Sequence, residues 1–164
     1  MAIVPVKKLS IGGVVIGQTN DVGKISGSSL ALTGAAAVGS LAATGGITTS
    51  GASGGIGYTS GGAVVQATNK STAVTLNQYS GQITMSNAAM AAGAESNFVL
   101  NNSKISANDQ IEVEMKSGGT AGSYLFGVTA VSAGLCTITV SNISSSSRSE
   151  ALVLQFTVKK GAIA

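Results

Sequence analysis

From Gly62 onward, apolar and polar residues alternate along the chain with a period of two, in runs separated by short groups of Gly, Ser and Asn. This alternation is typical of strands that bury one face. In the run from Asp109 to Met115, apolar side chains fall on one face while Glu112 and Glu114 fall on the other. The predicted strands are Ala63 to Thr68, Ala73 to Leu76, Gly81 to Met85, Glu95 to Leu100, Asp109 to Met115, Ser123 to Ser132, Gly134 to Asn142 and Ser149 to Lys159.

These short strands, with their Gly-, Ser- and Asn-rich connections, predict an all-β fold for residues 63–164. The arrangement that we expect is an antiparallel β-sandwich, jelly-roll-like in its connections. The last strand is predicted to place Leu152, Leu154, Phe156 and Val158 in the core. Only Asn87 to Ala92 has a helical composition, and it predicts one or two helical turns at most.

Residues 25–62 show a different pattern, in which small residues replace the alternation. Most of this stretch is Gly, Ala, Ser or Thr, and it has no charge and no proline. Burying its few larger side chains supplies at most roughly 12–24 kcal/mol. Ordering its backbone costs on the order of 40–75 kcal/mol. The larger residues, which we expect to meet their symmetry mates, are Ile25, Leu30, Leu32, Val38, Leu41, Ile47, Ile56 and Tyr58.

Association with other copies is the way in which such a segment gains enough buried surface. Close approach of several backbones favours small residues, and a single-chain solenoid needs more regular coils than this stretch offers. We therefore expect residues 25–62 to form an extended stem that intertwines in a homotrimer.

Residues 1–24 contain two short runs that are predicted to be strand-like, Ile3 to Val6 and Gly13 to Ile16, around a lysine pair. Pro5 restricts the first run to an edge strand or an extended arm. A frayed terminus is the ordinary interpretation, and an arm that docks on a neighbouring protein is the functional one. The predicted docking residues are Ile3, Val4, Val6, Lys7, Lys8, Val14 and Ile16.

Composition argues against most chemistry. The chain has no histidine, which is the commonest catalytic base and zinc ligand. Glu112 and Glu114 are candidates for a calcium site or an acid pair, but a solvated strand face explains them better. Cys136 alternates with apolar residues and is predicted to be a small buried side chain. No enzyme activity, cofactor or metal is expected.

The charge pattern and the hydropathy indicate whether nucleic acid or a membrane is an expected partner. Nine Lys or Arg face six Asp or Glu, giving a net charge of +3, and the basic residues are scattered. Nucleic-acid binders usually show a basic stripe with interleaved aromatic residues, so nucleic acid is not an expected partner. No run of about twenty apolar residues predicts a membrane span.

One stretch resembles a known class of proteins. The residues from Gly54 to Tyr58 and the sequence from Gly61 to Met85 are similar to head-fibre, decoration and short tail-fibre proteins of tailed bacteriophages. Asn87 to Ala89, the turn from Ser117 to Gly122 and the segment from Ser149 to Ala151 add to this resemblance. It implies a small β-domain, held as a homotrimer and tethered to the virion by a glycine-rich stalk.

The resulting hypothesis is a structural protein that decorates the outer surface of a phage capsid after synthesis in the host cytoplasm. Its expected partners are its own copies and the major capsid protein. The alternative is a tail-fibre or receptor-binding subunit, and a depolymerase is a third and weaker possibility. An exposed Tyr or Phe cluster at the outer tip would favour receptor binding, whereas a plain Ser/Thr tip would favour decoration.

Overall fold

The computed structural model describes residues 9–11, 14–16, 57–58 and 61–161. The chain divides into two compact units, Met1–Thr48 and Thr49–Ala164. In the first unit, β1 (Leu9–Ile11) pairs antiparallel with β2 (Val14–Ile16). The strand predicted from Gly13 to Ile16 is therefore confirmed at β2, and β1 is a strand that the pattern did not predict. The run from Ile3 to Val6 lies outside the described residues.

The second unit contains the strands predicted for the C-terminal part, and their ends agree to within a few residues. They are β3 (Ala63–Val65), β4 (Val74–Thr75), β5 (Ser80–Thr84), β6 (Glu95–Asn101), β7 (Gln110–Ser117), β8 (Tyr124–Ser132), β9 (Leu135–Asn142) and β10 (Val153–Lys159). The all-β prediction is thus confirmed, and none of the described residues is helical.

The helical turn predicted from Asn87 to Ala92 is wrong. Met90 instead forms a two-way backbone bridge with Arg148, in which each amide donates to the other residue's carbonyl, at 2.7 and 2.9 Å. The Met90 side chain is buried in the core. Alanine favours a helix, but six residues are too few to form a stable helix alone, so burial and backbone pairing with a distant segment decide the conformation.

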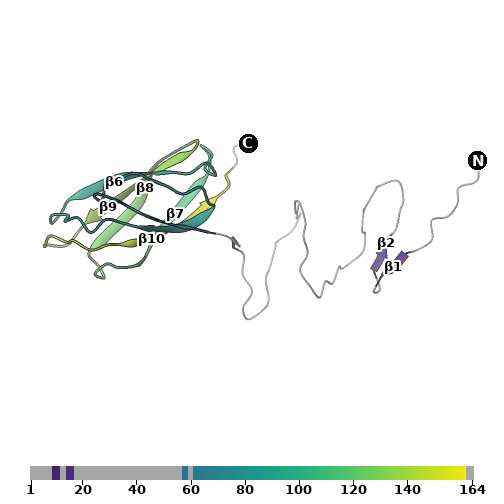
Figure 1. Ribbon diagram of the computed structural model, residues 1–164, viewed down its shortest axis with the longest axis horizontal. Coiled ribbons are helices and arrows are strands. Elements are labelled where there is room, and N and C mark those ends of the chain that lie inside the picture. The colour runs from purple at the N-terminus through teal and green to yellow at the C-terminus, as the bar shows by residue number, and fades with distance from the viewer. Residues whose placement is uncertain (1–8, 12–13, 17–56, 59–60, 162–164) are drawn as a thin grey trace, which may run out of the picture. The chain divides into compact units, whose positions relative to one another are not determined.

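The strands form two four-stranded sheets, ordered β3-β5-β10-β7 (sheet 1) and β4-β6-β9-β8 (sheet 2). Figure 1 shows them as two layers. The strands were expected to pair antiparallel throughout, but two pairs, β3 with β5 and β4 with β6, are parallel. The sandwich is therefore mixed, and the antiparallel prediction is wrong at these two pairs.

The parallel pairs have a simple physical origin. Consecutive strands from β3 to β6 alternate between the two sheets, so the chain runs up one layer and down the other. The third strand then returns beside the first in the same direction. Parallel neighbours need a crossover, and here a strand of the opposite sheet provides it.

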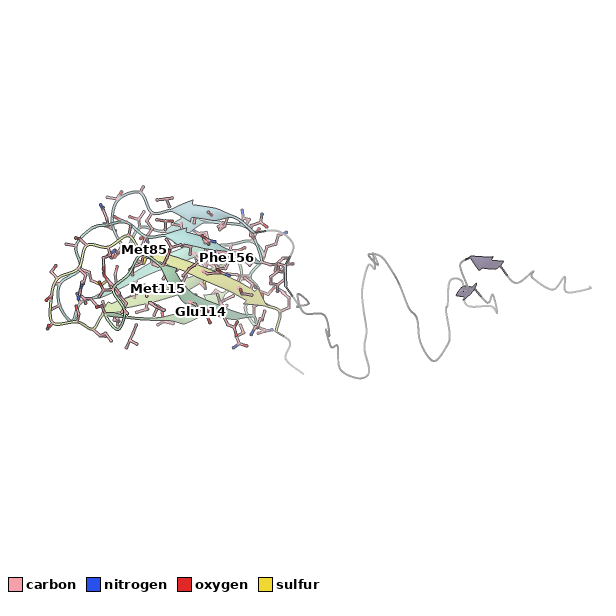
Figure 2. The ribbon with its side chains drawn as sticks, turned by 90° about the horizontal axis from the view of Figure 1, so that it is seen from below. Met85, Glu114, Met115 and Phe156 are labelled. Atoms are coloured by element: carbon pink, nitrogen blue, oxygen red, sulfur yellow. The ribbon has the colours of Figure 1, made fainter. Side chains whose placement is uncertain are left out.

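Side chains from both sheets share one core. Leu152, Leu154, Phe156 and Val158 are completely buried, which confirms the predicted core face of the last strand. Phe156 is labelled in Figure 2. Cys136, Ile138 and Val140 on β9 are equally buried and confirm the predicted alternation there. Burial raises the pKa of the Cys136 thiol to about 11, so this cysteine stays protonated at neutral pH and acts as a core residue.

The chain joins and leaves the sandwich at the same end. The Tyr58 hydroxyl donates to the Val158 carbonyl at 2.5 Å, and the Val158 amide donates to the Tyr79 carbonyl at 2.7 Å. We call this the junction end. The far end carries the connections 66–73, 85–94, 118–123 and 143–152.

Candidate binding surface

The outer face of sheet 1 presents polar side chains in register across three strands. Gln155 on β10 lies opposite Gln82 on β5 and Glu114 on β7. One rung nearer the junction end, Thr157 lies opposite Ser80 and Glu112. Because side chains alternate along a strand, these residues face away from the core that Phe156 occupies.

Two adjoining hollows lie along this face and share Ser80 and Gln155. One has a volume of about 290 Å³ and the other about 430 Å³. We call the pair the sheet-face groove. The smaller hollow is lined by Gly61, Gly62, Ser80, Gly81, Gln82, Lys116 and Gln155, and the larger by Gly57, Tyr58, Ser80, Gln155, Thr157 and Lys159.

An aromatic ring borders the larger hollow. Tyr58 is 45% exposed and stacks on Tyr79, with ring centroids 5.3 Å apart and planes inclined by 16°. Lys104 Nζ lies 5.8 Å from the centroid of the Tyr79 ring. The hydroxyl of Tyr58 is held by the Val158 carbonyl, so stacking and hydrogen bonding together fix its ring. Such a fixed ring loses little further conformational entropy when a ligand packs on it.

The polar side chains of the groove are free to bond a ligand. No hydrogen bond joins the side chains of Gln82, Gln155 and Thr157 to another described residue. By contrast, the buried amides of Asn102 and Asn142 bond to backbone groups of neighbouring loops. The groove therefore offers amide donors and acceptors that the described part of the fold does not use.

A polar cluster at the far end centres on Glu150. Its two carboxylate oxygens accept hydrogen bonds from the Thr120 hydroxyl at 2.5 Å and the Tyr124 hydroxyl at 2.6 Å. These bonds lower the pKa of Glu150, the bond from Thr120 most of all. Burial, together with the bond to Glu150, raises the pKa of Tyr124 to about 12. At neutral pH neither group is poised to exchange a proton, and the cluster serves to join loops.

Lys70 and Asp109 are also buried groups with structural partners. The Lys70 ammonium donates to the carbonyls of Ser86 at 2.7 Å and Glu150 at 2.5 Å. Burial lowers the pKa of Lys70. Asp109 accepts from Lys160 Nζ at 2.5 Å and from two backbone amides, and the bond from Lys160 is the main reason why the pKa of Asp109 is lowered.

The predicted acidic pair on β7 forms no site. Glu112 and Glu114 are exposed, and Glu112 makes an ion pair with Lys159 across the sheet. Among the described residues, no group of three acidic, Cys or His side chains is placed to hold a metal ion. No described helix is suited to crossing a membrane.

Most of the predicted docking and stem residues lie outside the described part of the chain, so their roles stay predictions. Of the docking set, Val14 and Ile16 are in β2, opposite Ile11 and Leu9. Of the stem set, Tyr58 packs on the sandwich and borders the groove. Sequence reasoning missed the groove. The sequence feature that could have indicated it is the pair of outward-facing polar positions on the last strand, Gln155 and Thr157.

Comparison of the chain with known protein families, with curated proteins and with solved structures finds no significant match. Function must therefore be argued from the residues and from the geometry of the fold.

Proposed function

We propose that the protein is a non-enzymatic structural subunit of a bacteriophage virion, displayed on the outer surface of the capsid. The observation that carries this proposal is that the first and last described segments of the sandwich domain meet at the junction end, through the bond from Tyr58 to Val158. A domain held at one end presents its sides and far end outward. This is the arrangement that a subunit tethered to a shell requires.

In this proposal residues 1–24 dock on the major capsid protein. The part of the 25–62 segment that precedes Gly57 winds with two other copies into a trimeric stem, whereas Tyr58 packs on the sandwich. The sandwich is then the outward domain. The homotrimer and the jelly-roll-like connections of the sandwich remain predictions. The titratable groups within the sandwich support a structural role, because Asp109, Tyr124 and Glu150 are all engaged in bonds that join loops.

The far end favours decoration over receptor binding at the tip. Its exposed residues include Ile143 and the serines from Ser145 to Ser147. The exposed tyrosines, Tyr58 and Tyr79, lie at the junction end instead. By the criterion set from the sequence, the far end lacks the exposed Tyr or Phe cluster that would favour receptor binding among its described residues, although Ile143 makes it more than a plain Ser/Thr tip.

The test has two steps. Electron microscopy of particles with and without the protein is expected to show its density on the head, and density confined to the tail would contradict the proposal. Deleting residues 1–21 is then expected to abolish co-sedimentation with undecorated capsids while the circular dichroism of the sandwich stays unchanged. Retained capsid binding by the folded, truncated protein would exclude the docking role of the arm.

A further inference from the structure

We propose that the sheet-face groove binds an oligosaccharide. This activity goes beyond the capsid-decorating role and does not depend on it, because it is argued only from the outer face of sheet 1. Three features of that face carry the inference: the row of unused polar side chains, the fixed aromatic ring and the shape of the hollows.

The polar lining has the chemistry that sugar hydroxyls require. A primary amide carries both donors and an acceptor on one planar group, so Gln82 and Gln155 can each bond two neighbouring hydroxyls. They lie opposite each other in register, and Ser80 and Thr157 form the next rung. A hydroxyl-rich chain laid across the rungs therefore meets a donor or an acceptor at each step.

The ring of Tyr58 supplies the apolar part of the site. A pyranose has a face of C–H groups that packs against aromatic carbon, and Tyr58 borders the larger hollow with its ring already fixed. The bond from its hydroxyl to Val158 leaves the ring, rather than the phenol oxygen, as the group available to a ligand. Preorganised aromatic side chains give affinity at low cost in conformational entropy.

The dimensions suit an extended ligand. The hollows, of about 290 and 430 Å³, adjoin through Ser80 and Gln155, so they form one elongated site on an open face. Small-molecule sites commonly have volumes of about 300–1,000 Å³. Gly61 also lines the smaller hollow, where a Cβ would lie 3.1 Å from the Ser80 carbonyl oxygen, so the absence of a side chain there leaves room beside Ser80.

A second copy of this chain is the main competing occupant. The centres of stable protein interfaces are rich in large apolar residues and poor in charge. Tyr58 is the only large apolar residue among the described lining residues, while Lys116 and Lys159 lie at the rim. The lining therefore favours a polar, hydroxyl-rich ligand over a protein surface.

The experiment starts with the full-length protein on an array of neutral and acidic oligosaccharides, followed by calorimetry with a sugar that binds. Tyr58→Ala and Gln155→Ala are each expected to weaken binding about tenfold, the size of one lost hydrogen bond or packing contact. Gln110→Ala is the matched control, since this exposed amide of β7 lies outside the groove. Its binding should equal that of the unaltered protein.

Thermal melts establish that each variant is folded, and a second substitution, Gln82→Ala, covers the case in which Tyr58→Ala unfolds the junction. Three results would overturn the proposal. They are no binding by any oligosaccharide on the array, equal binding by the groove variants and the control, or a changed sedimentation coefficient for Gln155→Ala, which would assign the groove to contact between copies. None of these results bears on capsid attachment.

Discussion

At the scale of single residues, β10 shows how alternation separates core side chains from outward-facing ones. Phe156 is completely buried and lies opposite Gly81 on β5 and Val113 on β7. Its neighbour Thr157 is only partly buried and faces the groove. Because a shift of one residue exchanges the two faces of a strand, this pair reports directly on register.

Phe156→Ala is expected to destabilise the sandwich by about 3–5 kcal/mol, the usual cost of truncating a buried Phe. This approaches the whole stability of many small domains. Thr157→Ala should change stability by about 0.5 kcal/mol or less, as surface substitutions usually do. Thermal melts and urea titrations of both variants measure the difference. A larger effect for Thr157→Ala than for Phe156→Ala would contradict the register.

A second residue-scale prediction concerns the stability of the sandwich at acidic pH. The pKa of Asp109 in the folded protein is lower than its ordinary value of 3.8, so the unfolded chain binds the proton more tightly. The Asp109 carboxylate stabilises the fold fully at pH values above its unfolded-state pKa. This stabilisation is lost as the pH falls through the lower pKa of the folded state. We expect the melting temperature to drop below about pH 4.

Asp109→Asn tests this directly. It should lower the melting temperature at pH 7, because the bond from Lys160 loses its charge, and the fall in melting temperature on acidification should become shallower. Glu112→Gln, at an exposed position, is the control and should change little, since exposed ion pairs contribute little to stability. Parallel acid profiles for Asp109→Asn and the unaltered protein would disprove the role of Asp109.

At the scale of elements, β5 lies between β3 and β10 and is closely packed by its neighbours at Gly81. A Cβ on Gly81 would lie 2.9 Å from the Gly62 carbonyl oxygen and 3.1 Å from Phe156 Cε1. The backbone of residue 62 and the ring of Phe156 therefore need a glycine at this point. Gly127 on β8, by contrast, has no atom within 4 Å of such a Cβ.

Gly81→Ala is expected to destabilise the sandwich by about 1–3 kcal/mol, the usual cost of overpacking. Gly127→Ala should be neutral or stabilise it by up to about 1 kcal/mol, because alanine restricts the unfolded chain. Urea titration of the two variants, compared with the unaltered protein, gives both values. Equal stabilities for the two would contradict the close approach of the Gly62 carbonyl and the Phe156 ring to Gly81.

The sequence pattern was sufficient to predict which segments become strands, because alternation reports on burial of one face at a time. It was not sufficient to predict the parallel pairs, since pairing depends on which sheet each strand joins, and β3 and β4 are too short to show it. The bridge at Met90 and the groove at Gln155 share this difficulty, as each depends on residues far apart in the chain. The glycine pair at residues 12 and 13, between two apolar runs, was a hairpin signal that was overlooked at β1 and β2.

At the scale of the whole molecule, the sandwich has a core of its own, whereas the stem is predicted to depend on association. Full-length protein should therefore sediment as a trimer, and a fragment of residues 57–164 should sediment as a folded monomer. Analytical ultracentrifugation at several concentrations, with circular dichroism of the fragment, measures both. A full-length monomer would contradict the trimeric stem, and a trimeric fragment would move the interface to the sandwich.

The junction end also determines how the domain responds to mechanical force. Tension transmitted along the chain at Gly57 acts first on the bond between Tyr58 and Val158 and then on β3, a three-residue strand paired only with β5. Pulling from one end of an edge strand separates its hydrogen bonds one after another rather than all together. Residues 57–65 would thus peel away at low force, lengthening the tether, while the core around β10 stays intact.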